Sequence, residues 1–402
     1  MIKTRDIGSR RELFVDDWLI DTMVGTRLQL TQPERREAVF TGDAPWEDQH
    51  AFPFDVIQDG DVVRMHYRAS VPDLTDETVS VMAMLESRDG GRTFTRPDLG
   101  LVEFNGSQHN NIVYRGGFPG FPEMFIDTNP NCPPHQRFKG FANRYQQLMP
   151  MASADGLRWK PLLDAPLPMP GQFDTINTAF WDTEAGCYRC YTRRWCDPRS
   201  EVAVRDVDLK NFDGDNWVRC IQHATSPDFI HWSEPEPLHY ADGNRYRVNL
   251  YTNAILSCTG AEHIHLGFPN RFIVEGVGSG KLYLRNDALF MASRDGLHWN
   301  RRLDAWVRPG LDDMNWTHRN NYPVWGIAQT SPVEWSMYIT EHYARAPQPT
   351  RVRRLSIRPW GFASVHGDYS GGGRVRLRRT QTQLHLHPRR RPGLDQHVGA
   401  DG

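Results

Sequence analysis

Short apolar runs separated by polar turns recur along most of the chain, and they predict β-strands. Residues 51–70, "AFPFDVIQDGDVVRMHYRAS", have the pattern of one strand, a polar turn at "QDGD" and a second strand. The same plan returns at residues 178–195, 254–272 and 322–343. Runs of this kind, bounded by Gly, Asp and Asn, are typical of β-hairpins. A less regular copy with a longer insertion lies between residues 110 and 146.

A short turn motif follows these strand pairs four times. Each copy has a serine, an aspartate two residues later, and an aromatic residue six or seven positions after the serine, as in "SRDGGRTF". The copies begin at Ser87, Ser153, Ser226 and Ser293, so the steps are 66, 73 and 67 residues. The aspartate can accept hydrogen bonds from backbone N–H groups of its own turn, and the aromatic residue anchors the outgoing strand. A repeat of this length indicates similar units that each pack on their neighbours.

The repeat predicts an all-β protein, a five-bladed β-propeller with about 70 residues per blade. The fifth blade has predicted strands near 322–329, 334–343 and 351–358 but lacks an outer strand. The segment "ELFVDDWLI", residues 12–20, offers one from the N-terminus. A ring closed by strands from both ends leaves no open sheet edge. We therefore expect residues 12–366 to form one propeller closed by an N-terminal strand.

The composition changes beyond this region. Residues 367–402 carry runs of arginine and almost no aromatic residues. They predict a short, irregular, basic C-terminal tail with no strand pattern. A basic binding arm and a truncated accessory β-segment are the two alternatives.

The bulk composition excludes some classes of partner. The chain has 402 residues, of which 47 are basic and 49 acidic, so its net charge is −2. Because strongly basic surfaces are what bind nucleic acids and anionic membranes, we expect neither as a partner. The 13 Trp, 13 Tyr and 19 Phe residues suit both sheet packing and stacking on sugars.

The segment "MIKTRDIGSRRELFVDD" lacks the apolar core of a signal peptide, and no run approaches the ~20 apolar residues of a membrane span. We expect a cytoplasmic protein, with export of a processed form as the open alternative, and its oligomeric state is left open. The six cysteines form no compact disulfide framework. Cys187 and Cys190 lie three apart on a predicted strand and would point to opposite faces, which disfavours a zinc site.

The repeated Ser-x-Asp-Gly-x-x-Trp pattern resembles the glycoside hydrolase propellers of families 32, 43, 68 and 117. Taken alone, "SRDGGRTF" is also similar to the Asp box of sialidases, which have six blades. "LFVDDWLID" and "LYTNAIL" resemble bacterial proteins described as family-32-like hydrolases without a defined substrate. The resemblance covers residues 12–366 and implies a five-bladed fold that acts on carbohydrate. One departure concerns the Ala-Asp-Pro segment of family 43, whose aspartate is the catalytic base; here the run is "HAFPFDVIQDGD", and Asp55 lies two residues later on the same strand face.

Propeller geometry restricts the candidates for a binding site. First strands begin at the funnel face, second strands end there, and third strands start there again. Reading the predicted strands this way collects polar residues from every blade. The carbohydrate-binding candidates are Glu47, Arg68, Asn177, Arg193, Asn253, Arg271, Asp287, Trp316 and Asn320.

Cleavage of a glycosidic bond needs one carboxyl group that protonates the leaving oxygen and a second that acts as base or nucleophile. We predict Glu341 as the acid, because an apolar strand and His342 flank it and would raise its pKa. Asp174 suits the base or nucleophile and should face Glu341 across the axis. Asp55 is the third candidate for catalysis, and Glu123 and Asp287 are held in reserve.

Three functions stay open on this evidence. The first is a glycosidase that acts from a non-reducing end. The second is a sialidase-like or uronate-directed hydrolase, indicated by Arg68, Arg193 and Arg271 at equivalent strand ends. The third is a carbohydrate-binding propeller without catalysis, indicated by the missing Ala-Asp-Pro segment. No cofactor is predicted; a divalent cation in the polar funnel is an open alternative, without a ligand spacing that commits to one.

Overall fold

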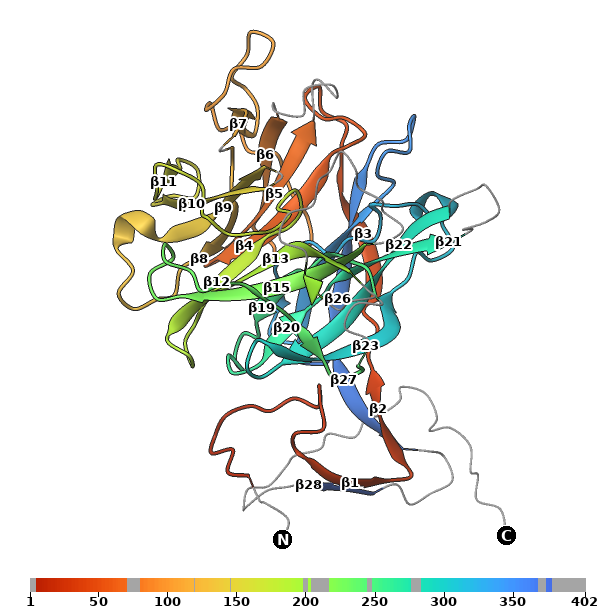
Figure 1. The fold of residues 1–402 in the computed structure, drawn as a ribbon. Coiled ribbons are helices and arrows are strands. Elements are labelled where there is room, and N and C mark those ends of the chain that lie inside the picture. The colour runs from red at the N-terminus through yellow and green to blue at the C-terminus, as the bar shows by residue number, and fades with distance from the viewer. Residues whose placement is uncertain are drawn as a thin grey trace, which may run out of the picture.

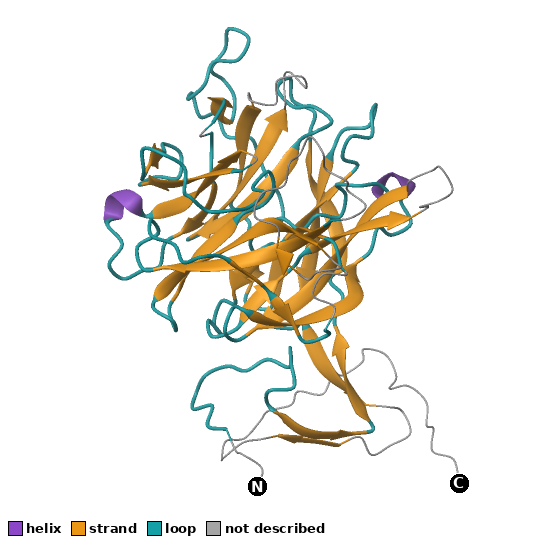
Figure 2. Ribbon diagram, in the orientation of Figure 1, coloured by secondary structure: helices purple, strands orange, loops and turns teal. Residues whose placement is uncertain are grey.

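The computed structural model describes residues 5–70, 80–118, 120–144, 146–197, 202–203, 217–243, 248–275, 283–367 and 374–377. The elements in these residues are β-strands, apart from the short 3₁₀ helices η1 (Pro134–Gln136) and η3 (Asp313–Asn315). Figure 2 shows strands throughout the body of the molecule. The predicted all-β class is therefore confirmed. Within the described residues, no helix is long and apolar enough to cross a membrane.

Four sheets have the antiparallel strand order of a propeller blade along their main path (Figure 1). The first contains β4 (Phe52–Asp59), β5 (Val62–Ser70), β6 (Ser80–Ser87) and β7 (Ile112–Gly116). The second contains β8 (Glu123–Ile126), β9 (Phe138–Arg144), β10 (Gln147–Ser153) and β11 (Lys160–Pro161). The third contains β12 (Thr178–Asp182), β13 (Cys187–Asp197), β15 (Val218–Ser226) and β16 (Glu236–Pro237), with β14 (Val202–Ala203) beside β13. The last contains β24 (Ala328–Ser331), β25 (Glu334–Glu341), β26 (Arg351–Ile357) and β3 (Glu34–Thr41).

A seven-stranded sheet lies between the third of these sheets and the last in chain order, and it departs from the regular blade. It contains β17 (His239–Tyr240), β18 (Leu250–Thr252), β19 (Ile255–Ser257), β20 (His265–Gly267), β21 (Asn270–Glu275), β22 (Tyr283–Ser293) and β23 (His298–Val307). Both β20 and β21 pair with β22, and β17 pairs in parallel with β23. The regular strand order is thus present in four sheets rather than the five that were predicted.

The sheets are arranged as in a propeller, with their first strands side by side. Strand β4 contacts β24 on one side and β8 on the other, and β12 contacts β8 and β19. The predicted propeller arrangement is therefore observed. The largest buried apolar cluster lies between the second, third, seven-stranded and last sheets, with rings such as Phe229, Phe268 and Trp299 at its centre. Blades that bury their aromatic faces against each other need no separate core of their own.

The strand that completes the last sheet comes from the N-terminus, but it is not residues 12–20. Strand β3 pairs with β26, whereas residues 12–20 are mostly turns. There, Leu13 and Val15 are buried. The prediction chose the most apolar N-terminal run. In the structure this run forms turns, and its apolar side chains are buried without joining the sheet. Strand β3 begins with five exposed residues, and therefore lacked the apolar pattern of a buried strand.

The C-terminal region is less irregular than predicted. Strand β27 (Ala363–Gly367) pairs with β2 (Thr26–Leu30), and β28 (Arg374–Leu377) pairs with β1 (Ile20–Val24). These two-stranded sheets extend from the body near the two termini (Figure 1). A tail without strands was therefore wrong for residues 374–377. Residues 368–373 and 378–402 of the predicted tail lie outside the described residues.

One disulfide joins neighbouring strands of the third sheet. Cys196 of β13 and Cys220 of β15 are bonded, and the two strands are paired along their length. The two cysteines are 24 positions apart in the sequence, so the sequence does not reveal their proximity. A pairing that depends on strand register was beyond the reach of a cysteine count.

The four predicted turn motifs form as expected. In each, the aspartate Oδ1 accepts backbone N–H bonds two to four residues ahead, as for Asp155 with Leu157 at 2.9 Å and Arg158 at 2.8 Å. The serine hydroxyl donates to the aspartate at 2.8 to 3.2 Å in the four copies. Within the motif, Trp159 Nε1 donates to the Gly156 carbonyl at 3.1 Å. All these bonds are local, which is why the sequence alone was sufficient to predict them.

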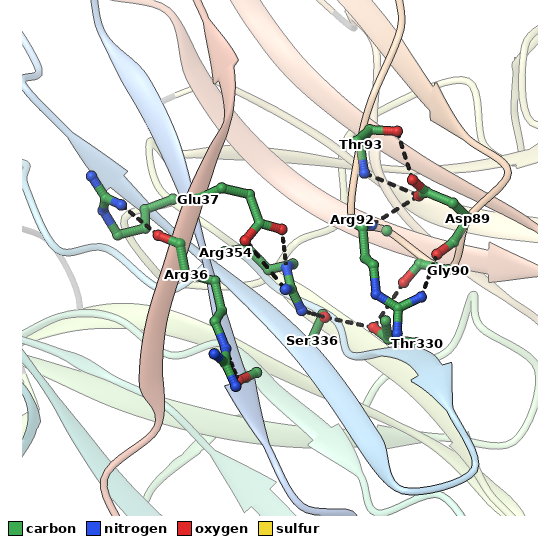
Figure 3. A network of polar contacts seen from close by, with 12 residues as sticks. Arg36, Glu37, Asp89, Gly90, Arg92, Thr93, Thr330, Ser336 and Arg354 are labelled. Atoms are coloured by element: carbon green, nitrogen blue, oxygen red, sulfur yellow. Dashed lines mark hydrogen bonds and ion pairs between the residues drawn. The ribbon is translucent and has the colours of Figure 1, made fainter.

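The first turn also joins its blade to the last sheet (Figure 3). Thr330 Oγ1 donates to the Gly90 carbonyl at 2.8 Å and lies 2.5 Å from Ser336 Oγ. The chain of contacts continues to Arg354, which donates to Ser336 at 3.0 Å and to Glu37 at 2.6 Å. Glu37 belongs to β3, so the turn, the last sheet and its N-terminal strand form one network.

Asp89→Ala is expected to cost about 1–2 kcal/mol of stability, because it removes several hydrogen bonds to one carboxylate. Burial alone would raise the pKa of Asp89, but hydrogen bonds from Thr93, Ser87 and the backbone lower it to about 2. The contribution is thus fully present above the ordinary value of 3.8 and is lost as the pH falls toward 2. Thermal melts at decreasing pH measure it. Asp155→Ala is the matched comparison, and a similar loss is expected there because Asp155 accepts the same kind of backbone N–H bonds. Unchanged stability in both variants would contradict the prediction.

Candidate functional site

Buried polar side chains tie the first strands of the sheets together around the axis. Asp55 of β4 is buried, and its two oxygens contact His66 Nδ1 at 2.6 Å and the Met124 backbone N–H at 3.2 Å. Met124 belongs to β8, so Asp55 joins the first two sheets. Both oxygens of this predicted catalytic residue are thus engaged in structural contacts.

Glu123 begins β8 and makes the corresponding contact to the third sheet. Its Oε2 accepts the Asn177 backbone N–H at 2.6 Å, and its Oε1 accepts Asn143 Nδ2 at 3.2 Å. Burial raises the pKa of Glu123 well above its usual range; the nearby charge of Asp55 adds to this, and the Asn177 donors oppose it without offsetting it. A carboxyl group in this environment holds its proton to a higher pH than an exposed glutamate does. This is the property that was predicted for Glu341.

Three of the predicted binding residues are buried amides that support the backbone. Asn253 Nδ2 donates to the carbonyls of Ile176 at 3.0 Å and Tyr191 at 2.9 Å. Asn177 Nδ2 likewise donates to two carbonyls of its own loop. Asn320 Oδ1 accepts the backbone N–H of Tyr343 at 2.8 Å. These side chains support the surrounding loops through their Nδ2 donors, although Asn177 Oδ1 has no partner in the described structure.

Glu341 lies in a different environment from the one predicted. It ends β25, is fully buried, and forms ion pairs with Arg35 at 2.7 Å, Arg351 at 2.6 Å and Arg353 at 2.8 Å. Burial raises its pKa, but the hydrogen bonds and charges of Arg353 and Arg351 outweigh burial and lower it. The expectation of a raised pKa is therefore wrong. The three arginines belong to β3 and β26, so this carboxylate holds the outer strands of the last sheet together.

Asp174 is the predicted carboxylate that stays accessible. Its side chain is 38% exposed and pairs with Arg193, which is buried in β13. Asp174 precedes Asn177 by three residues in the loop before β12. The same loop therefore carries Asp174 and contacts Glu123.

Arginines and tyrosines from several sheets converge near Asp174. We call this set the arginine–tyrosine cluster; it consists of Arg68, Arg193, Arg219, Arg319, Tyr251, Tyr322 and Tyr343. Arg193 and Arg219 lie over the Tyr251 ring, at 5.1 and 4.9 Å from its centroid. The Tyr251 ring is 5.3 Å from the Tyr322 ring. Guanidinium groups at these distances interact favourably with the ring faces.

The other arginine pair shares one tyrosine hydroxyl. Arg68 donates to Tyr343 Oη at 3.1 Å, and Arg319 donates to the same oxygen at 3.0 Å. Phe52 connects the two halves, with ring centroids 5.9 Å from Tyr343 and 5.5 Å from Tyr322. The cluster thus unites the predicted Arg68 and Arg193 with residues that the predicted binding set left out. Arg219 opposes Trp195 in the β13–β15 register, so correct strand pairing could have revealed it.

Three predicted binding residues line a separate side pocket. Arg271, Asp287 and Trp316 border a cavity of about 530 Å³, together with Leu303 and Leu311. Arg271 forms a two-pronged ion pair with Asp287, at 2.9 and 2.5 Å. The Trp316 side chain is half exposed at its rim. Asp287 neutralises Arg271, whereas among the described residues Arg68, Arg219 and Arg319 of the cluster form no ion pair with a carboxylate.

Glu47 serves a structural role away from the cluster. Its buried side chain accepts hydrogen bonds from Tyr67 at 2.5 Å and from Arg96 at 2.9 and 2.7 Å. It therefore has no oxygen left without a donor. As for metals, the described part of the chain contains no group of three or more His, Cys, Asp or Glu side chains that could hold an ion.

Comparisons with known proteins give structural neighbours only. No family model matches the chain, and no curated protein matches it. A solved N-acetylgalactosamine deacetylase from F. plautii is 12% identical, with a TM-score of 0.48 over 82% of this chain and 95% of its own. An α-L-arabinofuranosidase from Fusarium graminearum is 13% identical, with a TM-score of 0.45 over 83% of this chain and 99% of its own. An α-L-arabinofuranosidase from Podospora anserina is 10% identical, with a TM-score of 0.46 over 82% and 98%.

Proposed function

We propose that this chain is a glycoside hydrolase that cleaves a sugar from a non-reducing end, in the funnel of a five-bladed propeller. The observation that carries the proposal is a carboxyl group with a raised pKa, Glu123, held by the same loop that presents the accessible carboxylate Asp174. Glycosidases need such a pair in two different protonation states. The arginine–tyrosine cluster beside Asp174 supplies aromatic faces and hydrogen-bond donors for a sugar.

A fifth blade is supported by the form of the seven-stranded sheet. Strands β18 and β19 follow each other after a break at Asn253 and Ala254, and Ala254 has a positive φ of 43°. Strands β20 and β21 are separated by Phe268 and Pro269, and proline has no N–H to continue a ladder. If each pair is one interrupted strand, the sheet becomes a four-stranded blade. With β3 on β26, the ring is then closed by a strand from each end of the chain.

The acid and base roles follow from the two environments. We assign the general-acid role to Glu123, because burial raises its pKa. Asp174 is the base or nucleophile, because its exposed carboxylate lies beside the positive charge of Arg193. Glu341 no longer fits the acid role, since three arginines stabilise its ionised form.

A carbohydrate-binding propeller without catalysis is the second candidate. The observation that favours it is the structural use of two predicted catalytic carboxylates, Asp55 and Glu341. In this function the cluster would bind a sugar, and no bond would break. Turnover separates the two candidates.

The test is a screen of the full chain against nitrophenyl glycosides of neutral and acidic sugars and against oligosaccharides, with release of the aglycone or of a reducing end as the readout. We expect release from at least one substrate, and its loss in Asp174→Asn, which excludes a contaminating hydrolase. Calorimetric binding of a sugar without release from any substrate would instead support the binding protein. Release that is unchanged in Asp174→Asn would remove that residue from the mechanism.

A further inference from the structure

The arginine–tyrosine cluster has an excess of positive charge. Of its four arginines, only Arg193 forms an ion pair with a carboxylate among the described residues, and that carboxylate is Asp174. Burial and the neighbouring charge of Arg193 lower the pKa of Arg219 to about 10. Two guanidinium groups thus lie over the Tyr251 ring with one counter-charge between them. Holding like charges together in a partly buried site is costly unless a negative group joins them.

Several donors of the cluster also have no acceptor. Arg193 is 3% exposed, yet its Nε and Nη1 have no hydrogen-bond partner in the described structure. The same holds for Nε of Arg219, Nε of Arg68 and the hydroxyl of the buried Tyr322. Buried donors without acceptors are rare in proteins, so each one calls for an explanation such as a functional role or a missing partner. What these atoms require is an acceptor, preferably one with negative charge.

The arginine of the side pocket, unlike those of the cluster, has its charge fully balanced by a neighbouring carboxylate. Arg271 makes its two-pronged pair with Asp287, which satisfies one edge of the guanidinium, and it also donates to the Leu303 carbonyl at 3.1 Å. The fold therefore can neutralise an arginine with its own carboxylate where no charge is needed. In the cluster it leaves guanidinium edges open beside the accessible Asp174.

We propose that the cluster binds an acidic sugar, and that Arg193 and Arg219 hold its carboxylate. This assignment rests on the proposed function for the location of the sugar and narrows its substrate to uronic-acid-type glycosides. A carboxylate is planar and matches the guanidinium edge with paired hydrogen bonds. The sugar ring then lies against Tyr251, next to Asp174. Arg68 and Arg319 add positive charge on the far side of the aromatic row.

Calorimetric titration of the full chain tests the proposal. The probes are glucuronic and galacturonic acid, with glucose and galactose as neutral matches and glucose 6-sulfate as the other anion. We expect the uronic acids to bind at least roughly ten-fold more tightly than the neutral sugars, as charge-assisted hydrogen bonds imply. Equal affinity for acidic and neutral sugars, or no binding of either uronic acid, would overturn the proposal. Preference for the sulfate would overturn the assignment of a carboxylate.

The variant Arg219→Gln is the sharpest probe, because Arg219 has no carboxylate partner to leave unpaired. We expect it to weaken uronic acid binding by about 10- to 100-fold while its melting temperature stays the same or rises. Arg219→Lys keeps the charge but not the planar guanidinium edge. Its affinity for uronic acids should therefore lie between those of the wild type and Arg219→Gln. Arg88→Gln is the control, since Arg88 is an exposed arginine of the first turn motif, paired with Glu86. Unchanged uronic acid binding in Arg219→Gln would contradict the proposal.

The outcomes for the two proposals are separable. Selective uronic acid binding without cleavage of any glycoside would leave this inference standing and remove the hydrolase function. Cleavage of neutral glycosides, with no preference for uronic acids in binding or turnover, would keep the hydrolase and overturn the inference.

Discussion

Replacing Glu123 with glutamine is expected to lower turnover by roughly 10²–10⁴-fold, the usual loss when a general acid is removed. Glutamine is nearly isosteric and can still accept the Asn177 backbone N–H that Glu123 accepts at 2.6 Å. The third sheet should therefore keep its contact with the second, and sugar binding should persist. Turnover is measured on the substrate that the glycoside screen identifies, and binding by calorimetry.

The pH dependence gives this prediction a second readout. The wild-type rate should fall as the pH rises through the raised pKa of Glu123, and the variant should lack this alkaline limb. A raised carboxyl pKa also means that the folded protein keeps a proton that the unfolded chain loses above 4.5. Stability therefore falls as the pH rises above that value, and Glu123→Gln should remove the decline. Glu103→Gln, at an exposed position, is the control; a wild-type rate and alkaline limb in Glu123→Gln would assign the acid role elsewhere.

Glu341→Gln is expected to destabilise the fold by about 3 kcal/mol, the scale of loss when one partner of a buried ion pair is removed. The variant leaves Arg35, Arg351 and Arg353 close together without a negative charge, although each retains some contact with solvent. The pKa of Arg35 is already lowered, by burial and by the charges of the other two arginines, against the opposing effect of Glu341. Chemical denaturation of the wild type and the variant measures the difference.

A carboxylate on the same sheet provides the matched comparison. Glu34 and Arg36 form an exposed pair at 2.6 Å on β3, so Glu34→Gln should cost no more than about 1 kcal/mol. Because the pKa of Glu341 is lowered, its contribution is present above the ordinary value of 4.5 and is lost as the pH falls below it. A stable Glu341→Gln variant that loses only turnover would restore this residue to the catalytic mechanism.

The four turn motifs and most strand pairs could be predicted from the sequence. The reason is locality: Asp89 and Asp155 bond to backbone groups no more than four residues away. Strands β4 and β5, predicted within residues 51–70, are joined by a tight turn, and their pairing follows from alternation and turn chemistry. The regular spacing of the motif then predicted similar sheets packed side by side, and this arrangement is observed.

Partnerships across long separations could not be predicted in this way. The strand beside β26 was assigned to residues 12–20 because they are apolar, but β3 carries the complementary register and the Glu37 contact to Arg354. Residues 12–20 instead pack against the largest apolar cluster, and the burial of Leu13 and Val15 there stabilises the fold. Either segment satisfies the need for an edge strand, and only the packing of the whole chain distinguishes them.

The sequence by itself determined the class of fold and the repeating turns, whereas one funnel that gathers the polar side chains stays a prediction. Only the tertiary structure decided the charge state of each candidate, because a pKa depends on burial and on neighbours from distant strands. Three arginines lower the pKa of Glu341, whereas burial raises the pKa of Glu123 against its amide donors. Arg271 and Arg193 look alike in the sequence, but Asp287 satisfies the first, while the second keeps donors without acceptors.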